Sequence, residues 1–280
     1  MAGIVVASMF GGLGNQLFCW AAALALARRN NLELALECGS YKTDSYGRRF
    51  ALAGLGIVER TLTFNPLEAA LVPALARISM GRRGHVHVPG FDMLTDPGGT
   101  VNARLMTERF SGRCYLRGYW QSAAYFQNER ERISQAVTLA PCRPRQLSPE
   151  SVCVHIRSYK EAQLQHVDRD YYLAAYAACM KRLKHPNFVV YSDDLEWARE
   201  HEMLPPEFEA AGTFHDGGCR ASDLCELVSM SRFPNFIIAN STFSWWAAYL
   251  GGRTAWVQAP AASRKCWTAS DPLPADWSTL

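Results

Sequence analysis

The chain has 280 residues, of which 49% are hydrophobic and 20% are charged, and its formal net charge is +3. This composition excludes a disordered chain, a collagen-like fibre and a disulfide-stapled miniprotein, and the nearly balanced charge gives no sign of a nucleic-acid-binding surface. A chain of this length forms roughly two domains of ordinary size.

The cysteines and the apolar runs bear on where the protein works. None of the nine cysteines forms a C-x-x-C pair, and no cysteine–histidine set has zinc spacing, so we expect reduced thiols. The longest apolar run, residues 17–27, is too short to span a bilayer, and no targeting segment is recognisable. We therefore expect a cytoplasmic protein, either free or peripheral at the inner membrane face.

The first half opens with a strand–turn–helix–strand pattern that is typical of α/β folds. A β-branched apolar run at residues 4–9 predicts a strand, and an alanine- and leucine-rich segment ending at Arg29 predicts a helix. Between them lies a glycine-rich turn, and residues 32–37 predict a second strand. Glycines and prolines break the pattern between residues 60 and 112, where only a helix near 66–78 is predicted.

The second half alternates strands and helices more regularly. A polar segment at residues 141–149 contains three prolines and is the best candidate for a linker, which divides the chain into domains at 1–145 and 146–280. This alternation predicts a parallel sheet with helices on both faces. The predicted strands are 152–156, 188–191, 236–239 and 254–257, and the predicted helices are 170–184, 195–201, 221–230 and 243–250.

Polar residues follow three of these strands, at the carboxyl edge where open parallel sheets bind ligands. His155 and Arg157 end the first strand, Asp193 and Asp194 follow the second, and residues 240–242 follow the third. Because carboxyl ends of parallel strands meet at one edge, we expect these groups to converge. Core packing alone does not explain three polar strand ends.

Each group has a structural explanation beside a binding one. The planar guanidinium of Arg157 suits a diphosphate, but it also suits an ion pair with an acid such as Asp193. Ser241 is a good helix cap, while the neighbouring N–H groups suit a phosphate. Asp193 and Asp194 either cap the next helix or accept hydrogen bonds from ribose or a purine base. His155 is either an ordinary core histidine or one that orients Arg157 or the substrate.

Two other motifs are less specific. The glycine-rich turn at residues 10–16 matches neither G-x-G-x-x-G nor a P-loop, so it is either a tight turn or a backbone brought close to a ligand, with Asn15 reaching in. Asp168 and Asp170 match the D-x-D pattern of metal-dependent glycosyl transferases, but their position before a helix favours N-capping. No other metal-ligand set is present, and we predict no metal.

Five sequence blocks occur in an order that resembles the α-1,2-fucosyltransferases of glycosyltransferase family 11. The run that ends in two tryptophans is the most specific of them. The blocks are GGLGNQLF at 11–18, GYWQS at 118–122, VHIR at 154–157, FVVYSDD at 188–194 and IANSTFSWW at 238–246.

The resemblance implies an α/β, GT-B-like enzyme of two Rossmann-like domains with a donor cleft between them. Residues 1–145 would form the acceptor side and residues 146–280 the GDP-fucose-binding domain. The reaction would transfer L-fucose, with inversion, from GDP-fucose to the 2-hydroxyl of a terminal galactose in an oligosaccharide acceptor, with no metal or other cofactor. The alternatives are another GDP-sugar-dependent glycosyltransferase and a catalytically weak protein that binds a nucleotide or glycan.

The resemblance also implies roles for particular residues. Arg157, with His155, would act at the donor diphosphate, and Tyr119 or Trp120 would stack on the acceptor galactose. The donor-binding residues would be Gly14, Asn15, Arg157, Asp193, Asn240, Ser241, Thr242 and Phe243.

One block departs from the family pattern. The usual motif is His-x-Arg-Arg-Gly-Asp-Tyr, but here Arg157 is followed by Ser158, Tyr159, Lys160 and Glu161. The motif's Asp is therefore missing as a catalytic base. Glu161, another loop acid, or the phosphate leaving group takes the proton in its place, and the sequence leaves these alternatives open.

Overall fold

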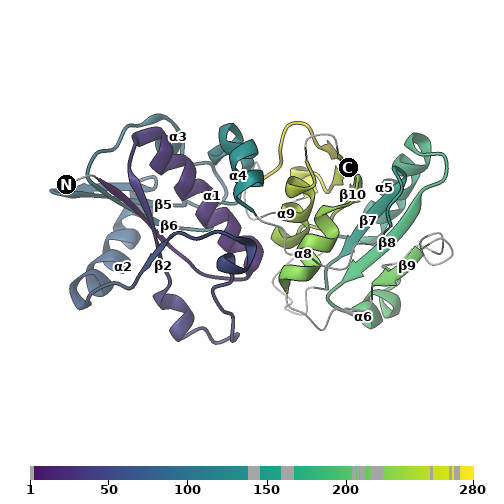
Figure 1. Ribbon diagram of the computed structural model, residues 1–280, viewed down its shortest axis with the longest axis horizontal. Coiled ribbons are helices and arrows are strands. Elements are labelled where there is room, and N and C mark those ends of the chain that lie inside the picture. Colours follow the sequence, from purple (N-terminus) through teal and green to yellow (C-terminus); the bar gives the residue numbers. More distant parts are fainter. Residues whose placement is uncertain are drawn as a thin grey trace. The chain divides into compact units, whose positions relative to one another are not determined.

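The computed structural model describes residues 3–137, 146–158, 167–203, 206, 208, 212–215, 223–252, 255–264, 267 and 272–280. The chain divides into two compact units, Met1–Thr138 with Thr268–Pro274, and Leu139–Trp267 with Ala275–Leu280. Each unit has its own six-stranded sheet (Figure 1). The boundary predicted at 145/146 adjoins residues outside the described ranges and stays a prediction.

The first unit is built on a sheet with the strand order β3-β2-β1-β6-β5-β4, in which only β4 is antiparallel to its neighbour. The strands are β1 (Ile4–Ser8), β2 (Glu33–Glu37), β3 (Arg60–Leu62), β4 (His85–Val88), β5 (Phe91–Thr95) and β6 (Arg113–Arg117). The helices are α1 (Leu13–Asn30), α2 (Pro66–Gly81), α3 (Ala103–Thr107) and α4 (Arg130–Ala136). Short 3-10 turns lie at Gly39–Lys42, Leu52–Leu55, Ala123–Tyr125 and Gln127–Glu129.

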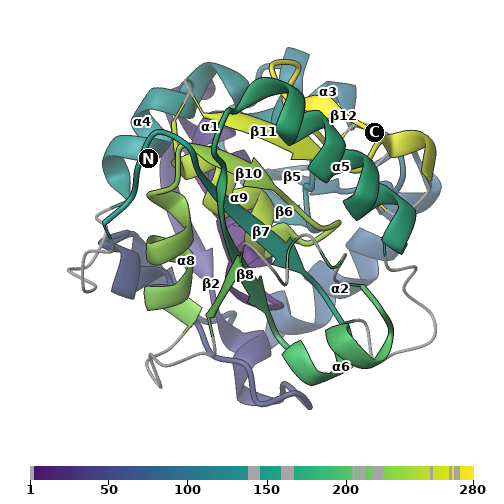
Figure 2. The ribbon, with the colours of Figure 1, turned by 90° about the vertical axis from the view of Figure 1, so that its right-hand side faces the viewer.

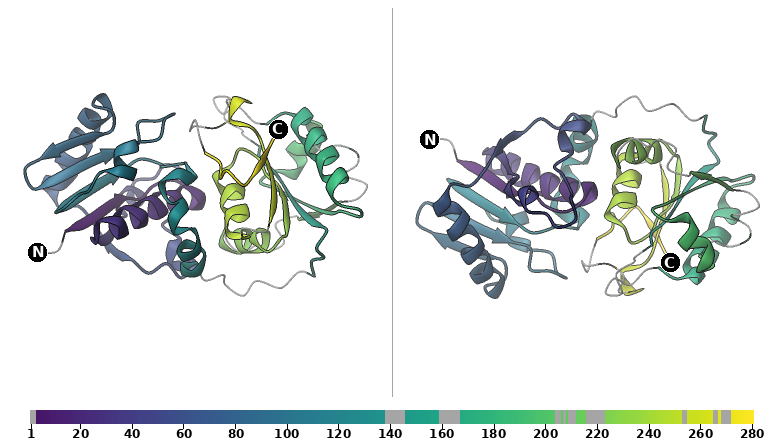
Figure 3. Two further views of the ribbon diagram at one scale, coloured as in Figure 1. Left: turned by 90° about the horizontal axis from the view of Figure 1, so that it is seen from above. Right: turned by 90° about the horizontal axis from the view of Figure 1, so that it is seen from below.

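Helices α1 and α2 cover opposite faces of this sheet (Figures 1 and 3). Val72 and Ala76 of α2 pack against Val6 of β1 and Met93 of β5. Because side chains alternate along a strand, the residues flanking Val6 face the other side, toward α1. The chain runs from β1 to β2 on one side and returns to β6 on the other, so the strand order reverses between the carboxyl ends of β1 and β6.

The second unit has the strand order β12-β11-β10-β7-β8-β9, with parallel neighbours throughout its described strands. Its strands are β7 (Ser151–Ile156), β8 (Asn187–Ser192), β9 (Gly212–His215), β10 (Asn235–Ile237), β11 (Trp256–Ala259) and β12 (Ser278–Thr279). Its helices are α5 (Arg169–Arg182), α6 (Leu195–Glu200), α8 (Asp223–Ser231) and α9 (Thr242–Leu250), with a 3-10 turn at Ala262–Arg264. Helices α5 and α6 lie on one face of the sheet and α8 and α9 on the other (Figure 2).

Two adjacent tyrosines of α5 fix the carboxyl ends of the central strands. The Tyr172 hydroxyl donates to the carbonyl of His155 at 3.1 Å. The Tyr171 hydroxyl lies 2.8 Å from the carbonyl of Ile238 and 2.9 Å from that of Gln258. Both rings are buried, so these bonds hold the strand ends that carry the polar residues in a dry environment.

The sequence predicts strands β7, β8, β10 and β11 and the four helices of the second unit named above with small shifts at their ends, but it does not predict strands β9 and β12. The strand expected at 254–257 instead runs over Trp256–Ala259, and β10 ends at Ile237 rather than at residue 239. In the first unit the helix near 66–78 is confirmed as α2, whereas strands β3 to β6 were not predicted. Each of these strands has five residues or fewer, and the glycines and prolines between them hide the period-two pattern.

Gly118 allows the chain to pass close to Asp96 at the end of β6. A Cβ on Gly118 would lie 2.2 Å from the Asp96 Cβ and 2.8 Å from its backbone nitrogen. We expect Gly118→Ala to lower the free energy of unfolding by about 1–3 kcal/mol, the usual cost of overpacking. Urea denaturation measures this, with Gly81→Ala as the matched control because a Cβ there meets nothing within 4 Å. Equal losses of unfolding free energy in the two variants would contradict the close approach of Gly118 to Asp96.

Candidate functional site

The predicted polar strand ends of the second unit come together at one edge of its sheet. Strand β7 lies between β10 and β8, so His155 and Arg157, Asp193, and residues 240–242 follow three neighbouring strands. The chain leaves β7 toward β8 and later returns to β10 on the other side. The carboxyl ends of β7 and β10 therefore flank the reversal of strand order, which is where open α/β sheets bind ligands.

Arg157 is held at this edge by Asp193. Its Nη1 lies 3.0 Å from Oδ2 of Asp193, and the two side chains are 42% and 28% exposed. The same carboxylate accepts hydrogen bonds from the Ser158 backbone N–H at 2.8 Å and from the Ser158 hydroxyl at 2.9 Å. The ion pair considered from sequence is thus present, and Asp193 fixes both the guanidinium and the start of the following loop.

His155 is buried beside this pair. Only 4% of its surface is exposed to solvent. The centroid of its ring lies 6.4 Å from that of Phe243 at the start of α9. Burial, followed by the charge of Arg157, lowers the pKa of His155 to about 3. Nδ1 has no hydrogen-bond partner among the described residues. A neutral imidazole of this kind can orient a ligand or Arg157, but its low pKa makes it a poor base.

The low pKa of His155 has a measurable consequence for stability. A histidine in the unfolded chain titrates near 6.5, so between that pH and about 3 the unfolded state binds one more proton than the folded state. The free energy of unfolding should therefore fall as the pH is lowered through this window, by at most about 1.4 kcal/mol per pH unit from this group. We expect His155→Gln to show a shallower fall than the wild type in urea denaturation between about pH 6 and pH 4. If the unfolding free energies of the wild type and the variant fell in parallel with pH, a buried neutral His155 would be contradicted.

The N-terminus of α9 forms the other side of this edge. Ser241 is the N-cap, and its hydroxyl accepts from the Phe243 N–H at 3.3 Å, so the capping role is confirmed. Asn240 and Ser241 are 8% and 7% exposed, and Thr242 is half-buried. First-turn N–H groups of a helix lack intrahelical partners and attract anions.

The aromatic residues that follow anchor α9 rather than extend the site. Trp245, Trp246 and Tyr249 are at most 1% exposed. The Trp245 ring stacks on Tyr249 at 4.8 Å and meets Trp246 edge-on at 5.1 Å. Large buried aromatic contacts of this kind fix a helix in the core. They therefore fix the helix N-terminus at the carboxyl edge of the sheet.

Glu226 of α8 belongs to the same electrostatic environment, and the sequence did not predict it. Burial raises its pKa, and the negative charges of Asp223 and Asp193 add to the effect, while Arg157 opposes it. The half-buried carboxyl is thus within electrostatic reach of the Arg157–Asp193 pair. The sequence does contain one signal for Glu226. It is an acid among the apolar residues of α8, the helix that directly precedes β10 and its polar end.

The remaining acids act as helix caps. Asp194 accepts from the Trp197 N–H at 2.9 Å and caps α6. Asp168 accepts from the Tyr171 N–H at 2.9 Å, caps α5 and pairs with Arg264 at 3.1 Å. Within the described ranges no three His, Cys, Asp or Glu side chains gather as a metal site. Asp168 therefore caps α5, as its position predicted, and Asp170 lies in the first turn of the same helix.

The glycine-rich turn of the first unit lies at that unit's own reversal of strand order. Gly11 has φ 78°, and a Cβ there would lie 2.7 Å from Nδ2 of Asn15. Helix α1 begins after Gly12 without a side-chain cap and has no acid in its first turn, which includes Gly14. Asn15 Oδ1 accepts from Gln121 Nε2 at 2.8 Å, which ties the turn after β1 to the segment after β6.

The two aromatic residues predicted to contact the acceptor differ in exposure. Tyr119 is 40% exposed, and its ring lies 4.7 Å from that of Phe10. Trp120 is 1% exposed and packs edge-on against Tyr125, so its ring has no face open to a sugar. Tyr119 also lines a pocket of about 90 Å³ with Gln121 and Asp96. Trp120 therefore belongs to the core, and the acceptor role of Tyr119 stays a prediction.

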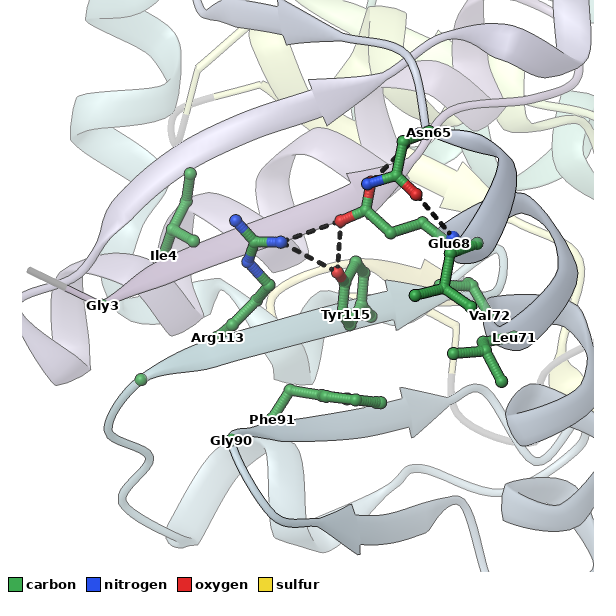
Figure 4. Close-up of a pocket in the computed structure, with 12 residues that line it drawn as sticks. Gly3, Ile4, Asn65, Glu68, Leu71, Val72, Gly90, Phe91, Arg113 and Tyr115 are labelled. Carbon is green, nitrogen blue, oxygen red and sulfur yellow. Dashed lines mark hydrogen bonds and ion pairs between the residues drawn. The ribbon is translucent and has the colours of Figure 1, made fainter. Parts of the chain in front are cut away.

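A larger pocket, of about 520 Å³, lies at the amino ends of β1, β5 and β6, away from the glycine-rich turn (Figure 4). Glu68 accepts from Tyr115 Oη at 2.7 Å and from Arg113 Nη1 at 2.8 Å inside it. Ligands of open parallel sheets bind at the carboxyl ends. This pocket is therefore separate from the predicted site. Glu161, the predicted base, lies outside the described residues.

The comparisons with known proteins agree with this arrangement. Residues 103–270 match the family described as glycosyl transferase family 11. Alpha-1,2-colitosyltransferase of Escherichia coli is 27% identical over 98% of both chains, and the O-antigen biosynthesis glycosyltransferase WbnK of Escherichia coli is 25% identical over 86% of this chain and 88% of its own.

The fold is similar to that of a solved structure. A mutant of Arabidopsis thaliana FUT1 in complex with GDP superposes with a TM-score of 0.53 and 13% identity, covering 92% of this chain and 70% of that one. This likeness confirms the predicted α/β, GT-B-like fold. No helix in the described part of the chain is long and apolar enough to cross a membrane. With more than half of its length matched by the family's pattern, the chain belongs to glycosyl transferase family 11.

Proposed function

We propose that the protein transfers L-fucose, with inversion, from GDP-fucose to the 2-hydroxyl of a terminal galactose in an oligosaccharide acceptor. The observation that carries this proposal is that Arg157 and the N-terminus of α9 follow the neighbouring parallel strands β7 and β10, at the same edge of the sheet, in a chain of this family. A guanidinium and a helix N-terminus on one strand edge are suited to a diphosphate.

The donor residues divide by what they offer the nucleotide sugar. Arg157 supplies charge to the β-phosphate, and the N–H groups around Ser241 and Thr242 supply uncharged donors. Asp193 positions Arg157 through the ion pair and through Ser158. Glu226 offers a carboxylate that accepts from base or sugar N–H and O–H groups. Gly14 and Asn15 lie in the first turn of α1, a helix N-terminus without a side-chain cap, which is suited to an anion.

The chemistry is a single displacement at the anomeric carbon of the donor sugar. The galactose 2-oxygen forms a bond to that carbon while the bond to the β-phosphate oxygen breaks, through an oxocarbenium-like transition state. Both electrons of the broken bond leave with GDP, so negative charge grows on the β-phosphate beside Arg157. The hydroxyl proton goes to an acid of the loop after β7 or to the departing phosphate. The neutral, low-pKa His155 is not this base.

A second donor sugar has support of its own. The relative that matches this chain over 98% of both lengths is named as an alpha-1,2-colitosyltransferase. Colitose is L-fucose without its 3-hydroxyl. A site with a buried hydrogen-bond partner for that hydroxyl discriminates between the two sugars by about 10⁴-fold, and a site without one accepts both.

GDP release from candidate donors tests the proposal. Purified full-length protein is mixed with GDP-fucose, GDP-colitose or GDP-mannose and with lactose, lacto-N-biose or N-acetyllactosamine. We expect turnover with GDP-fucose and not with GDP-mannose. Turnover with GDP-colitose alone would overturn fucose as the sugar while keeping the reaction class. Binding of GDP without release from any donor and galactoside pair would indicate a binding protein.

Metal independence is a further expectation. The carboxylate of Asp168 is engaged by the Tyr171 N–H and by Arg264, so the D-x-D pattern has a structural role. We expect the rate of GDP release to be unchanged by EDTA and by added Mn²⁺. Loss of activity in EDTA with recovery in Mn²⁺ would contradict this and return Asp168 and Asp170 to consideration as metal ligands.

A further inference from the structure

Helix α2 is apolar on two opposite sides, although only one of them is covered. Its inner residues Val72 and Ala76 pack against the first unit's sheet. On the outer side, Leu67 is 67% exposed, Leu71 43% and Ile78 48%, and Ala74 is exposed as well. These four positions are spaced by four, three and four residues, which places them on one side of the helix. We call them the outer stripe.

The outer stripe continues into the large pocket of the first unit. Leu71 lines that pocket together with Ile4 and Phe91 (Figure 4), and Leu67 is a further lining residue. Solvent-exposed leucines are ordinary when scattered singly, but a contiguous apolar surface with a pocket beside it marks an interaction site. An apolar helix face of this kind is stabilised when it is buried against an apolar partner.

The charged residues near the outer stripe indicate which kind of partner binds it. No Asp or Glu occurs between Glu68 and Asp92, whereas Arg77, Arg82 and Arg83 all lie in this segment and are exposed. Within the described ranges, none of the three forms an ion pair with an acid. Apolar residues beside unpaired arginines are suited to a membrane surface with anionic headgroups.

We infer that the outer stripe and these three arginines dock the protein on an anionic lipid surface. The leucines and Ile78 enter the boundary between headgroups and acyl chains, and the arginines contact lipid phosphates. A second copy of this chain is a poorer partner, because its matching face carries the same positive charge. The inference goes beyond glycosyl transfer, since it concerns a face at α2 and not the polar strand ends.

Vesicle flotation with the full-length protein tests the inference. Vesicles are made of phosphatidylcholine alone or with about one-third phosphatidylglycerol. The wild type should float with the anionic vesicles and dissociate at high salt, since exposed charges are screened. Arg82→Gln with Arg83→Gln should weaken partitioning by about 30-fold, at roughly fivefold for each arginine.

The apolar contribution is tested with a matched pair of variants. Leu71→Gln with Ile78→Gln should lose binding to anionic vesicles by more than about tenfold. Val58→Gln with Met180→Gln is the control, since these side chains are 87% and 43% exposed elsewhere in the chain, and it should bind as the wild type does. Unchanged GDP release and thermal unfolding show that each variant is folded.

Three outcomes would overturn the inference. The first is a wild type that floats with neither vesicle. The second is an outer-stripe variant that binds as tightly as the Val58 and Met180 control. The third is a wild-type dimer in solution that the outer-stripe variant converts to a monomer, because a second copy would then cover the face.

Discussion

Replacing Arg157 by alanine should lower kcat by about 10²-fold or more, the scale of losing one donor to a charge that grows in the transition state. The guanidinium lies at the strand edge, with its Nη1 3.0 Å from Oδ2 of Asp193. Stopped-flow or coupled measurement of GDP release from the donor gives the rate. Turnover within a few-fold of the wild type, in a folded variant, would remove Arg157 from the mechanism.

The lysine variant separates charge from geometry at this position. Arg157→Lys keeps the positive charge but loses the planar fork that contacts two phosphate oxygens at once. We expect it to recover part of the lost rate. Equal rates for the lysine and alanine variants would show that the fork, rather than the charge, is what the diphosphate requires.

Replacing Asp193 by alanine should lower kcat/KM for the nucleotide sugar by about 10²-fold, the scale on which a misplaced group slows a reaction. The variant loses the Arg157 ion pair and both hydrogen bonds from Ser158. Because Asp193 is proposed to act through Arg157, the loss should be small in an Arg157→Ala background. Isothermal titration with GDP and steady-state kinetics of the single and double variants measure this coupling.

Asp193→Asn serves as the matched variant. Its amide oxygen can still accept from Ser158, while the charge that pairs with Arg157 is gone. We expect a loss smaller than that of alanine. Additive effects of the Asp193 and Arg157 substitutions would contradict the positioning role and would indicate that Asp193 contacts the donor independently.

The sequence allowed the second unit to be predicted well for a physical reason. Its strands are apolar runs bounded by turns, and the residue types after each run are polar enough to stand out, as with Arg157 and Asp193. The rule that parallel strands share a carboxyl edge then brings those residues together without further information. Asp168 was placed correctly by the preference of Asp for helix N-caps.

Other parts of the site depend on contacts that a linear pattern does not contain. Tyr119 and Trp120 are neighbours of similar chemistry, but the left-handed backbone of Trp120 turns its ring into the core while Tyr119 stays half in solvent. Glu226 lies on α8, and only its raised pKa, caused first by burial and then by the charges of Asp223 and Asp193, links it to the Arg157–Asp193 pair. Strands β3 to β6 were missed because the glycines and prolines around them break up the apolar runs that revealed the equally short β1 and β2.

The proposed reaction is inverting transfer to the 2-hydroxyl of galactose from a GDP-linked sugar. Proton and carbon NMR of the product from GDP-β-L-fucose and a β-galactoside reports both the new linkage and its anomeric configuration. We expect an α-linked fucose on the galactose 2-oxygen, with one GDP released for each bond formed. A β-linked product, a linkage to another hydroxyl, or no product from any GDP-linked 6-deoxy sugar would contradict it.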